Sequence, residues 1–200
     1  MRAQKPREKR QQRTQQAILD AARQIINQEG IGQLSIRAIA QRIDYSPAGL
    51  YEYFGSKEEI LQALCTQGHK RLRDHLLQVD TSLPPDEYLM QLGLAYIAFA
   101  RANPDFYLLI FTNPPDPVES EKMTSETSSY LVLLQAIERG LKSGGFKPRP
   151  GFGLQEMAYA AWSLVHGISM LRITFLKDYS QDMDAADREA LLTLNRGLKG

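Results

Sequence analysis

The chain has very little cysteine, with one thiol, Cys65, among 200 residues. One cysteine cannot form an internal disulfide, a pattern typical of a protein in a reducing cytoplasm. Cys65 falls within an apolar helical stripe, so we expect it to be a small core residue. Histidine is also scarce, and His69 and His75 are spaced wrongly to share one helix face as zinc ligands. We therefore expect no metal ion and no other cofactor.

Long apolar runs and glycine-rich motifs are missing as well. No stretch reaches the roughly eighteen apolar residues that indicate a transmembrane helix. The N-terminus is charged and rich in glutamine rather than apolar, so we expect no signal peptide. The phosphate-binding glycine loop and the Gly-x-Ser-x-Gly elbow are both absent. An enzyme is therefore the weaker of the functional classes considered, and a cytoplasmic protein is expected.

Net charge is small overall but unevenly distributed. The formal charge of the whole chain is only +1. Residues 1–57 carry ten Lys/Arg and five Asp/Glu, whereas the remainder carries fourteen basic and eighteen acidic residues. A basic first quarter followed by a mildly acidic body indicates a polyanionic partner for the N-terminal part, although a solvated run of charge would look the same.

The apolar spacing predicts an all-α fold with about nine helices. Apolar residues recur at three and four positions along most of the chain, and no alternating strand pattern of useful length occurs. Residues 1–9 are polar and basic and are predicted to form a mobile arm. We expect helices at about 10–29, 36–43, 47–53, 57–79, 85–102, 104–112, 119–143, 153–177 and 184–197.

Two short helices joined by a tight turn have the geometry that delivers a helix to a DNA major groove. Ser35 and Ser46 are good N-caps for the helices expected at 36–43 and 47–53. The second helix opens with Pro47, Ala48 and Gly49, small residues that allow close approach to base edges. Ser56 and Glu59 form a capping-box pattern for the next helix.

These residues resemble the TetR family of bacterial regulators. The resemblance covers about residues 12–62 and depends on the runs Leu34-Ser35-Ile36-Arg37-Ala38-Ile39-Ala40 and Ser46-Pro47-Ala48-Gly49-Leu50-Tyr51-Glu52-Tyr53-Phe54-Gly55-Ser56-Lys57-Glu58-Glu59-Ile60-Leu61. One departure lies in the turn, which in the family usually reads glycine and then a small apolar residue. Here it reads Asp44-Tyr45, and aspartate tolerates the left-handed conformation that such a turn needs.

The resemblance implies a DNA-binding transcriptional regulator, usually a repressor, that binds a palindromic operator as a homodimer. It implies a DNA-binding domain at 10–56, a linking helix at 57–79 and a ligand-binding and dimerisation domain at 80–200. Leu50 and Phe54 match core positions. Residues that match phosphate-binding positions are Ser35, Arg37, Ser46, Tyr51 and Lys57, and those that match base-facing positions are Pro47, Ala48, Gly49 and Tyr53.

The C-terminal half carries a second, shorter resemblance. Trp162, His166 and Gly167 match a Trp-x-x-x-His-Gly signature found in one branch of TetR C-terminal domains. The family resemblance places the dimer interface on the last two helices, as a four-helix bundle across a two-fold axis. An apolar stripe there supports this position: Ala158, Ala161, Val165, Ile168, Leu171 and Phe175.

A small-molecule effector is expected in this C-terminal part, because a regulator needs a second site that biases two states. Cations are few here, which favours an apolar or aromatic effector. Candidate pocket residues are Tyr96, Phe99, Phe106, Tyr130, Trp162, His166 and Met170. The alternative interpretation makes these residues core and interface. A ligand-binding protein without DNA binding, and a plain three-helix subdomain, are further alternatives for the whole chain and its N-terminal part.

Overall fold

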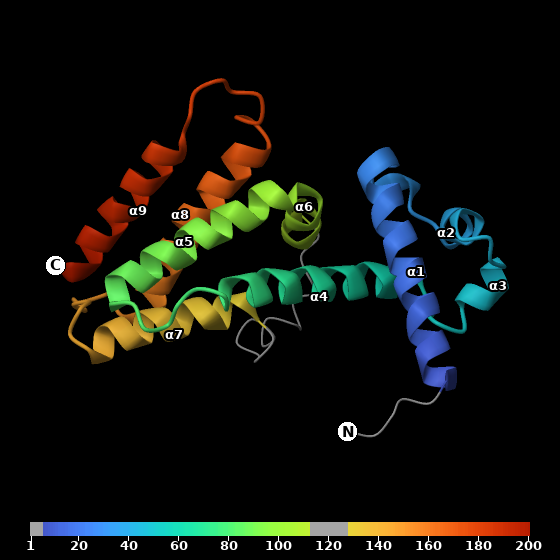
Figure 1. The fold of residues 1–200 in the computed structure, drawn as a ribbon, viewed down its shortest axis with the longest axis horizontal. Coiled ribbons are helices and arrows are strands. Elements are labelled where there is room, and N and C mark those ends of the chain that lie inside the picture. The colour runs from blue at the N-terminus through green and yellow to red at the C-terminus, as the bar shows by residue number, and fades with distance from the viewer. Residues whose placement is uncertain (1–5, 113–127) are drawn as a thin grey trace. The chain divides into compact units, whose positions relative to one another are not determined.

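The computed structural model describes residues 6–112 and 128–200. The predicted all-α class is confirmed. No strand forms within the described ranges, where one isolated antiparallel bridge joins Arg149 and Phe152. The α-helices are α1 (Pro6–Glu29), α2 (Ile36–Arg42), α3 (Pro47–Leu50), α4 (Lys57–Leu76), α5 (Pro85–Ala102), α6 (Pro104–Thr112), α7 (Ser129–Lys142), α8 (Leu154–Ile173) and α9 (Asp184–Lys199), and a short 3-10 helix, η1 (Ile31–Gln33), follows α1 (Figure 1).

Several helix ends differ from the predicted ones, and α4 ends at Leu76 rather than at residue 79. The first helix begins at Pro6, four residues earlier than expected, because proline suits a first helical position where its missing N–H is not needed. Pro6–Lys9, predicted as part of a mobile arm, are therefore helical, while residues 1–5 of that arm lie outside the described residues. Thr174 has φ −119° and ψ −86°, which ends α8 before the predicted residue 177. The predicted start of the 119–143 helix lies outside the described residues.

The chain divides into two compact units between Gln67 and Gly68. In the first unit, α1 packs against η1 and α2, and α2 packs against α3 (Figure 1). Its core contains the fully buried side chains of Ile18, Ile39, Leu50, Ile60 and Leu64. Cys65 is buried as predicted, at 6% exposure.

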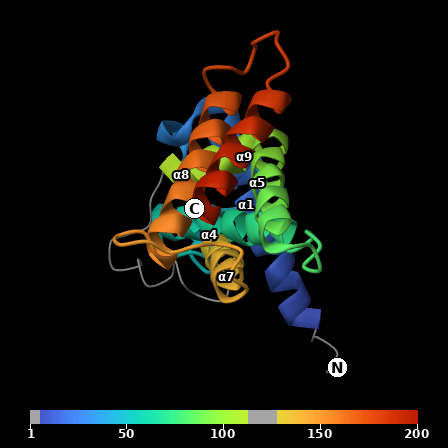
Figure 2. The same ribbon diagram turned by 90° about the vertical axis from the view of Figure 1, so that its left-hand side faces the viewer.

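In the second unit, α5 is the central helix and packs against α6, α7, α8 and α9. Figure 2 shows α5, α8 and α9 side by side. At the α7 end, Phe146 lies directly on Gly140, where an added Cβ would stand 2.0 Å from the ring. At the other side of α5, Asn195 Nδ2 donates to the backbone carbonyl of Asp86 over 2.8 Å, and Lys199 pairs with the Asp86 carboxylate at 2.6 Å. These contacts make the second unit one closely packed helical body.

Candidate functional site

The turn between α2 and α3 adopts the left-handed conformation that Asp44 was expected to tolerate. Asp44 has φ 52° and is the non-glycine residue with positive φ in the described part of the chain. The next residue, Tyr45, donates its backbone N–H to the carbonyl of Ala40 over 2.9 Å, which closes α2. This geometry gives a helix-turn-helix from short elements, as the sequence predicted.

Serine hydroxyls cap both helices. Ser35 Oγ accepts from the Ala38 N–H at 3.1 Å, and Ser46 Oγ accepts from the Gly49 N–H at 3.0 Å. Each hydroxyl accepts in its cap, so its own O–H proton can still be donated outward. Ser56 caps α4 through Glu59 N, while the Glu59 carboxylate accepts from the Gly55 N–H at 2.7 Å.

The third helix is shorter than predicted. We expected it to reach Tyr53, but α3 ends at Leu50, and Tyr51–Tyr53 form a turn in which Tyr53 N donates to Leu50 O over 2.9 Å. Leu50 is fully buried and Phe54 is half-buried, consistent with their predicted core positions. We call Ser46–Tyr53 the recognition segment.

The residues proposed to meet DNA lie on the surface of this unit. Tyr51 is 58% exposed, and the exposed set also contains Ser35, Arg37, Ser46, Pro47 and Ala48, while Gly49, Tyr53 and Lys57 are half-buried. A residue outside the predicted set joins them, because the ring of Tyr45 contacts both Gly49 and Tyr53. The departure at Asp44-Tyr45 was the one sequence signal that marked this residue.

Among the predicted phosphate contacts, two are cations. Within residues 6–112 and 128–200, Arg37 and Lys57 have no carboxylate partner, so their charges are available to an external anion. Arg42 is different, because it pairs with Glu29 at 2.7 Å and donates to Gln28 Oε1 at 2.9 Å. Arg42 thereby ties α2 to the end of α1, and its charge is already partly neutralised.

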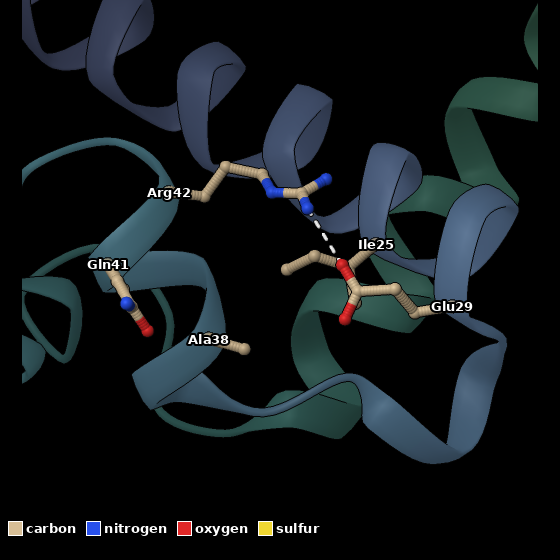
Figure 3. Close-up of a pocket in the computed structure, with 5 residues that line it drawn as sticks. All are labelled: Ile25, Glu29, Ala38, Gln41 and Arg42. Carbon is tan, nitrogen blue, oxygen red and sulfur yellow. Dashed lines mark hydrogen bonds and ion pairs between the residues drawn. The ribbon is translucent and has the colours of Figure 1, made fainter.

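A shallow pocket of about 290 Å³ lies between α1 and α2. Figure 3 shows the Arg42 guanidinium reaching across it to the Glu29 carboxylate, with Ala38 and Gln41 on the α2 side. Ile25 completes the lining. Arg42 and Glu29 are the charged residues of this pocket, and they pair with each other. The pair holds α2 against α1 and leaves no unpaired charge in the pocket for a ligand.

The second unit contains a cluster of rings, which we call the aromatic cluster: Tyr96, Tyr107, Phe111, Tyr130, Trp162 and His166. At its centre, the Tyr107 hydroxyl lies 2.7 Å from His166 Nδ1 and donates to the Tyr96 hydroxyl at 3.1 Å. Phe111 lies 4.6 Å from the His166 ring and Tyr130 lies 5.6 Å from the Trp162 ring, centroid to centroid. Three polar groups thus lie among aromatic rings, where Tyr96 and Tyr107 are buried and His166 is half-buried.

Burial keeps these polar groups uncharged at neutral pH. It raises the pKa of Tyr96 to about 12, and it raises the pKa of Tyr107 further above its usual value. Burial also lowers the pKa of His166 from the usual 6.5. Three residues after His166 on α8, Ser169 is fully buried and acts to lower the pKa of Tyr107, although its Oγ makes no hydrogen bond of normal geometry in the described part of the chain. A buried, unsatisfied hydroxyl of this kind is uncommon.

The structure brings only some of the predicted pocket residues together. Tyr96, Tyr130, Trp162 and His166 meet in the aromatic cluster. Met170 follows His166 by one turn of α8 and is half-buried.

Phe99 and Phe106 lie elsewhere, because they pack on side chains of α4. The Phe99 ring lies 5.8 Å from His75, and the Arg71 guanidinium lies 4.5 Å from the centre of Phe106. Tyr107 and Phe111 take their places in the cluster. Their spacing of four residues on α6 was the available signal, since it puts both rings on one helix face.

The apolar stripe of α8 is also divided. Ala158, Ala161 and Val165 face the core, whereas Leu171 is 50% exposed and Phe175 is 87% exposed. Tyr159 on the same helix is exposed as well.

No set of three metal-ligating side chains occurs among the residues described. Of the helices in the described ranges, none is both long enough and apolar enough to cross a membrane.

Comparison with known proteins finds a family match in each of the two units. Residues 18–64 match the family of bacterial regulatory proteins described as tetR, and residues 89–194 match the tetracyclin repressor-like C-terminal domain. The helix-turn-helix transcriptional regulator YobS of Bacillus subtilis is 28% identical over 158 residues, which cover 79% of this chain and 78% of YobS.

Solved structures share the fold. A protein of unknown function from Rhodococcus sp. RHA1 superposes with a TM-score of 0.78 at 22% identity, covering 93% of this chain and 95% of its own. The TetR family regulator PfmR from Thermus thermophilus superposes with a TM-score of 0.66 at 22% identity, covering 92% and 99%. The helix-turn-helix geometry and the two family matches, which together span most of the molecule, show that this chain belongs to the TetR family of DNA-binding transcriptional regulators.

Proposed function

We propose that the protein is a homodimeric repressor that binds a palindromic operator and leaves it when a small molecule occupies the C-terminal unit. Residues 10–56 act as the DNA-binding domain, 57–79 as the linking helix, and 80–200 as the ligand-binding and dimerisation domain. The observation that carries the proposal is the surface formed by two serine-capped helices with Arg37 and Lys57, which have no carboxylate partner among the described residues.

The DNA contacts divide by chemistry. Ser35 and Ser46 donate their free hydroxyl protons to phosphate oxygens, and Arg37, Tyr51 and Lys57 hold the backbone in the same way. These contacts fix the register of the protein on the duplex. Pro47, Ala48, Gly49 and Tyr53 face the bases, where small apolar atoms can touch thymine methyl groups.

Selection from a pool of random duplexes tests the DNA part of this proposal. The expected product is a palindromic consensus, bound by two chains, with an affinity that falls steeply between about 50 and 200 mM salt because phosphate contacts release counterions. Binding without sequence preference, or binding insensitive to salt, would contradict it. In cells, deletion of the gene should raise transcription from the selected operator.

The effector site is placed at the aromatic cluster. Its polar groups are neutral at pH 7, and its walls are rings, so it suits an uncharged apolar or aromatic molecule with one hydrogen-bonding group. The buried Ser169 hydroxyl, which makes no hydrogen bond of normal geometry among the described residues, supports this, because a ligand group would satisfy it.

A thermal-shift screen with uncharged aromatic compounds tests the effector site. A true effector should raise the melting temperature and release the selected duplex. Trp162→Ala should remove both responses, whereas Tyr159→Ala, at an exposed position of the same helix, should keep them. Retention of both responses by Trp162→Ala would remove the aromatic cluster from the proposal.

Dimerisation is placed on α8 and α9. Leu171 is half exposed on α8, and covering it with a second copy would remove apolar surface from water. Leu171→Glu should therefore give a monomer by analytical ultracentrifugation. Leu77→Glu is the matched control, because Leu77 is 45% exposed but lies after the end of α4. A dimer in the Leu171→Glu variant would place the interface elsewhere.

A further inference from the structure

The side chain of Tyr45 packs against the backbone of Gly49, a contact that the sequence does not predict. An added Cβ at Gly49 would stand 2.6 Å from Tyr45 Cε1 and 3.1 Å from Tyr45 Cδ1. Real Cβ contacts are not this short, so the Tyr45 ring fills the position where a side chain at residue 49 would begin. A side chain at residue 49 would therefore displace the Tyr45 ring from the position that it occupies.

A backbone hydrogen bond and a ring contact hold Tyr45 in this position. The backbone N–H of Tyr45 is fixed to Ala40 O at 2.9 Å, directly after the left-handed Asp44. On its other side, the edge of the ring meets Tyr53, with ring centroids 6.3 Å apart and planes at 73°. This edge-to-face arrangement is a favourable one for aromatic pairs. We call Tyr45 and Tyr53 the tyrosine pair.

The pair is a surface feature, because Tyr45 remains 40% exposed. A residue that only filled the core of the turn would be covered, as Leu50 is. The hydrogen bond with Tyr53 raises the pKa of Tyr45, and the charge of Glu52 acts in the same direction, while the charge of Arg10 acts in the opposite one. The phenol of Tyr45 is therefore an exposed group beside the recognition segment.

We propose that Tyr45 is a specificity-determining residue of the DNA interface, which supplies the side chain missing at Gly49 and sets the orientation of Tyr53 toward one base pair of each half-site. The inference depends on the proposed base-facing positions of Gly49 and Tyr53, and it adds a residue to them. A phenol has an apolar face for a thymine methyl group and a hydroxyl for a base acceptor.

The test uses a pool of duplexes with a randomised core of about twenty base pairs, which holds two half-sites one helical turn apart. Wild-type protein, Tyr45→Val and Tyr53→Val are each taken through selection. Tyr45→Val should weaken discrimination about tenfold at one position per half-site, the size of a single mismatched base pair. Tyr53→Val should weaken it at the same position, and the double variant should add little.

Two further variants separate this role from general structure. Tyr51→Phe, at a proposed phosphate contact, should lower affinity for all sequences alike and leave the preference unchanged. Gly49→Ala should relax the same position in the wild-type background and cause no further relaxation of that position in Tyr45→Val, where the ring that it displaces is gone. Any loss of overall affinity caused by the added methyl group should be alike in both backgrounds. Tyr45→Leu repeats the test with the volume largely kept, should Tyr45→Val not fold.

An even loss of affinity across all sequences in Tyr45→Val or Tyr45→Leu would overturn the proposal, as would a change at a position that Tyr53→Val does not affect. If the wild-type protein selects no sequence, the proposal that it binds a specific operator is wrong, and the inference about Tyr45 fails with it. If the wild-type protein selects an operator and the Tyr45 variants keep its full base preference, the inference alone fails.

Discussion

The two units place their candidate residues in opposite surroundings. In the first unit the residues proposed to meet DNA are exposed or half-buried on short helices capped by serine. In the second unit the polar groups of the aromatic cluster lie inside the helical packing, and Tyr107 is fully buried. A surface site can change without altering the core beneath it. An internal site shares its contacts with the core, so function and stability should change together there.

Phe146→Ala should have the largest effect, because it empties the space above Gly140. Loss of a fully buried phenylalanine costs about 3–5 kcal/mol of unfolding free energy. Tyr51→Ala in the first unit is the matched aromatic truncation, and it should lower DNA affinity while changing the unfolding free energy little. Urea unfolding followed by circular dichroism measures the stability of both variants. Equal losses of stability would break the contrast between the units.

Tyr107→Phe should have the next largest effect. It keeps the ring but removes the hydroxyl that lies 2.7 Å from His166 Nδ1 and donates to Tyr96. We expect a loss of about 1–2 kcal/mol, because buried partners are left with poorer hydrogen bonds. Tyr159→Phe, at an exposed position of α8, should cost nothing measurable in the same denaturant titration. A stable Tyr107→Phe variant would mean that the hydroxyl network contributes little to folding.

Lys57→Ala should act on binding alone. Loss of one phosphate contact should weaken binding evenly across sequences and reduce the slope of log affinity against log salt by about 0.9. Fluorescence anisotropy at several salt concentrations measures this. Lys142 pairs with Glu138 at 2.8 Å in the second unit, so Lys142→Ala is the control and should leave the slope unchanged. A slope unchanged in Lys57→Ala would contradict a phosphate contact.

Acidification should produce the smallest change. Burial lowers the pKa of both His69 and His166 below the usual 6.5 in the folded second unit. Below about pH 6.5 the unfolded chain binds protons that the folded chain does not, so stability present above that pH is lost as the pH falls. Melting temperatures of His166→Asn should vary less with pH than those of the wild type. A wild-type melting temperature that rises on acidification would reverse this sign.

Much of the first unit follows from local sequence. Ser35, Ser46 and Ser56 each cap the helix that was expected of them, because a cap depends on contacts within three residues. The packing of the Tyr45 ring on Gly49 was not predicted, since residue spacing alone does not show where a ring at a turn will point. The predicted α3 was too long because the sequence is compatible with two structures after Leu50. The hydrogen bonds that the Leu50 carbonyl accepts can belong either to a continuing helix or to a turn.

The second unit was harder to predict because its site is formed by non-local packing. Helical periodicity shows that Phe99, Phe106 and Tyr107 face inward, but not which neighbouring helix each one meets. Phe99 and Phe106 pack on α4, while Tyr107 reaches His166 on α8. Trp162 and His166 could be placed together, because their separation of four residues fixes them on one face of a single helix.

The buried thiol of Cys65 can serve as a built-in probe of local unfolding around α4. Burial raises the pKa of this thiol, so little of the reactive thiolate exists while the surrounding helices are folded. Each chain carries one such group, and the rate at which a thiol reagent modifies it will report how often its surroundings expose it. A cysteine introduced at an exposed position would react far sooner, which allows site-specific labelling of the otherwise unmodified chain.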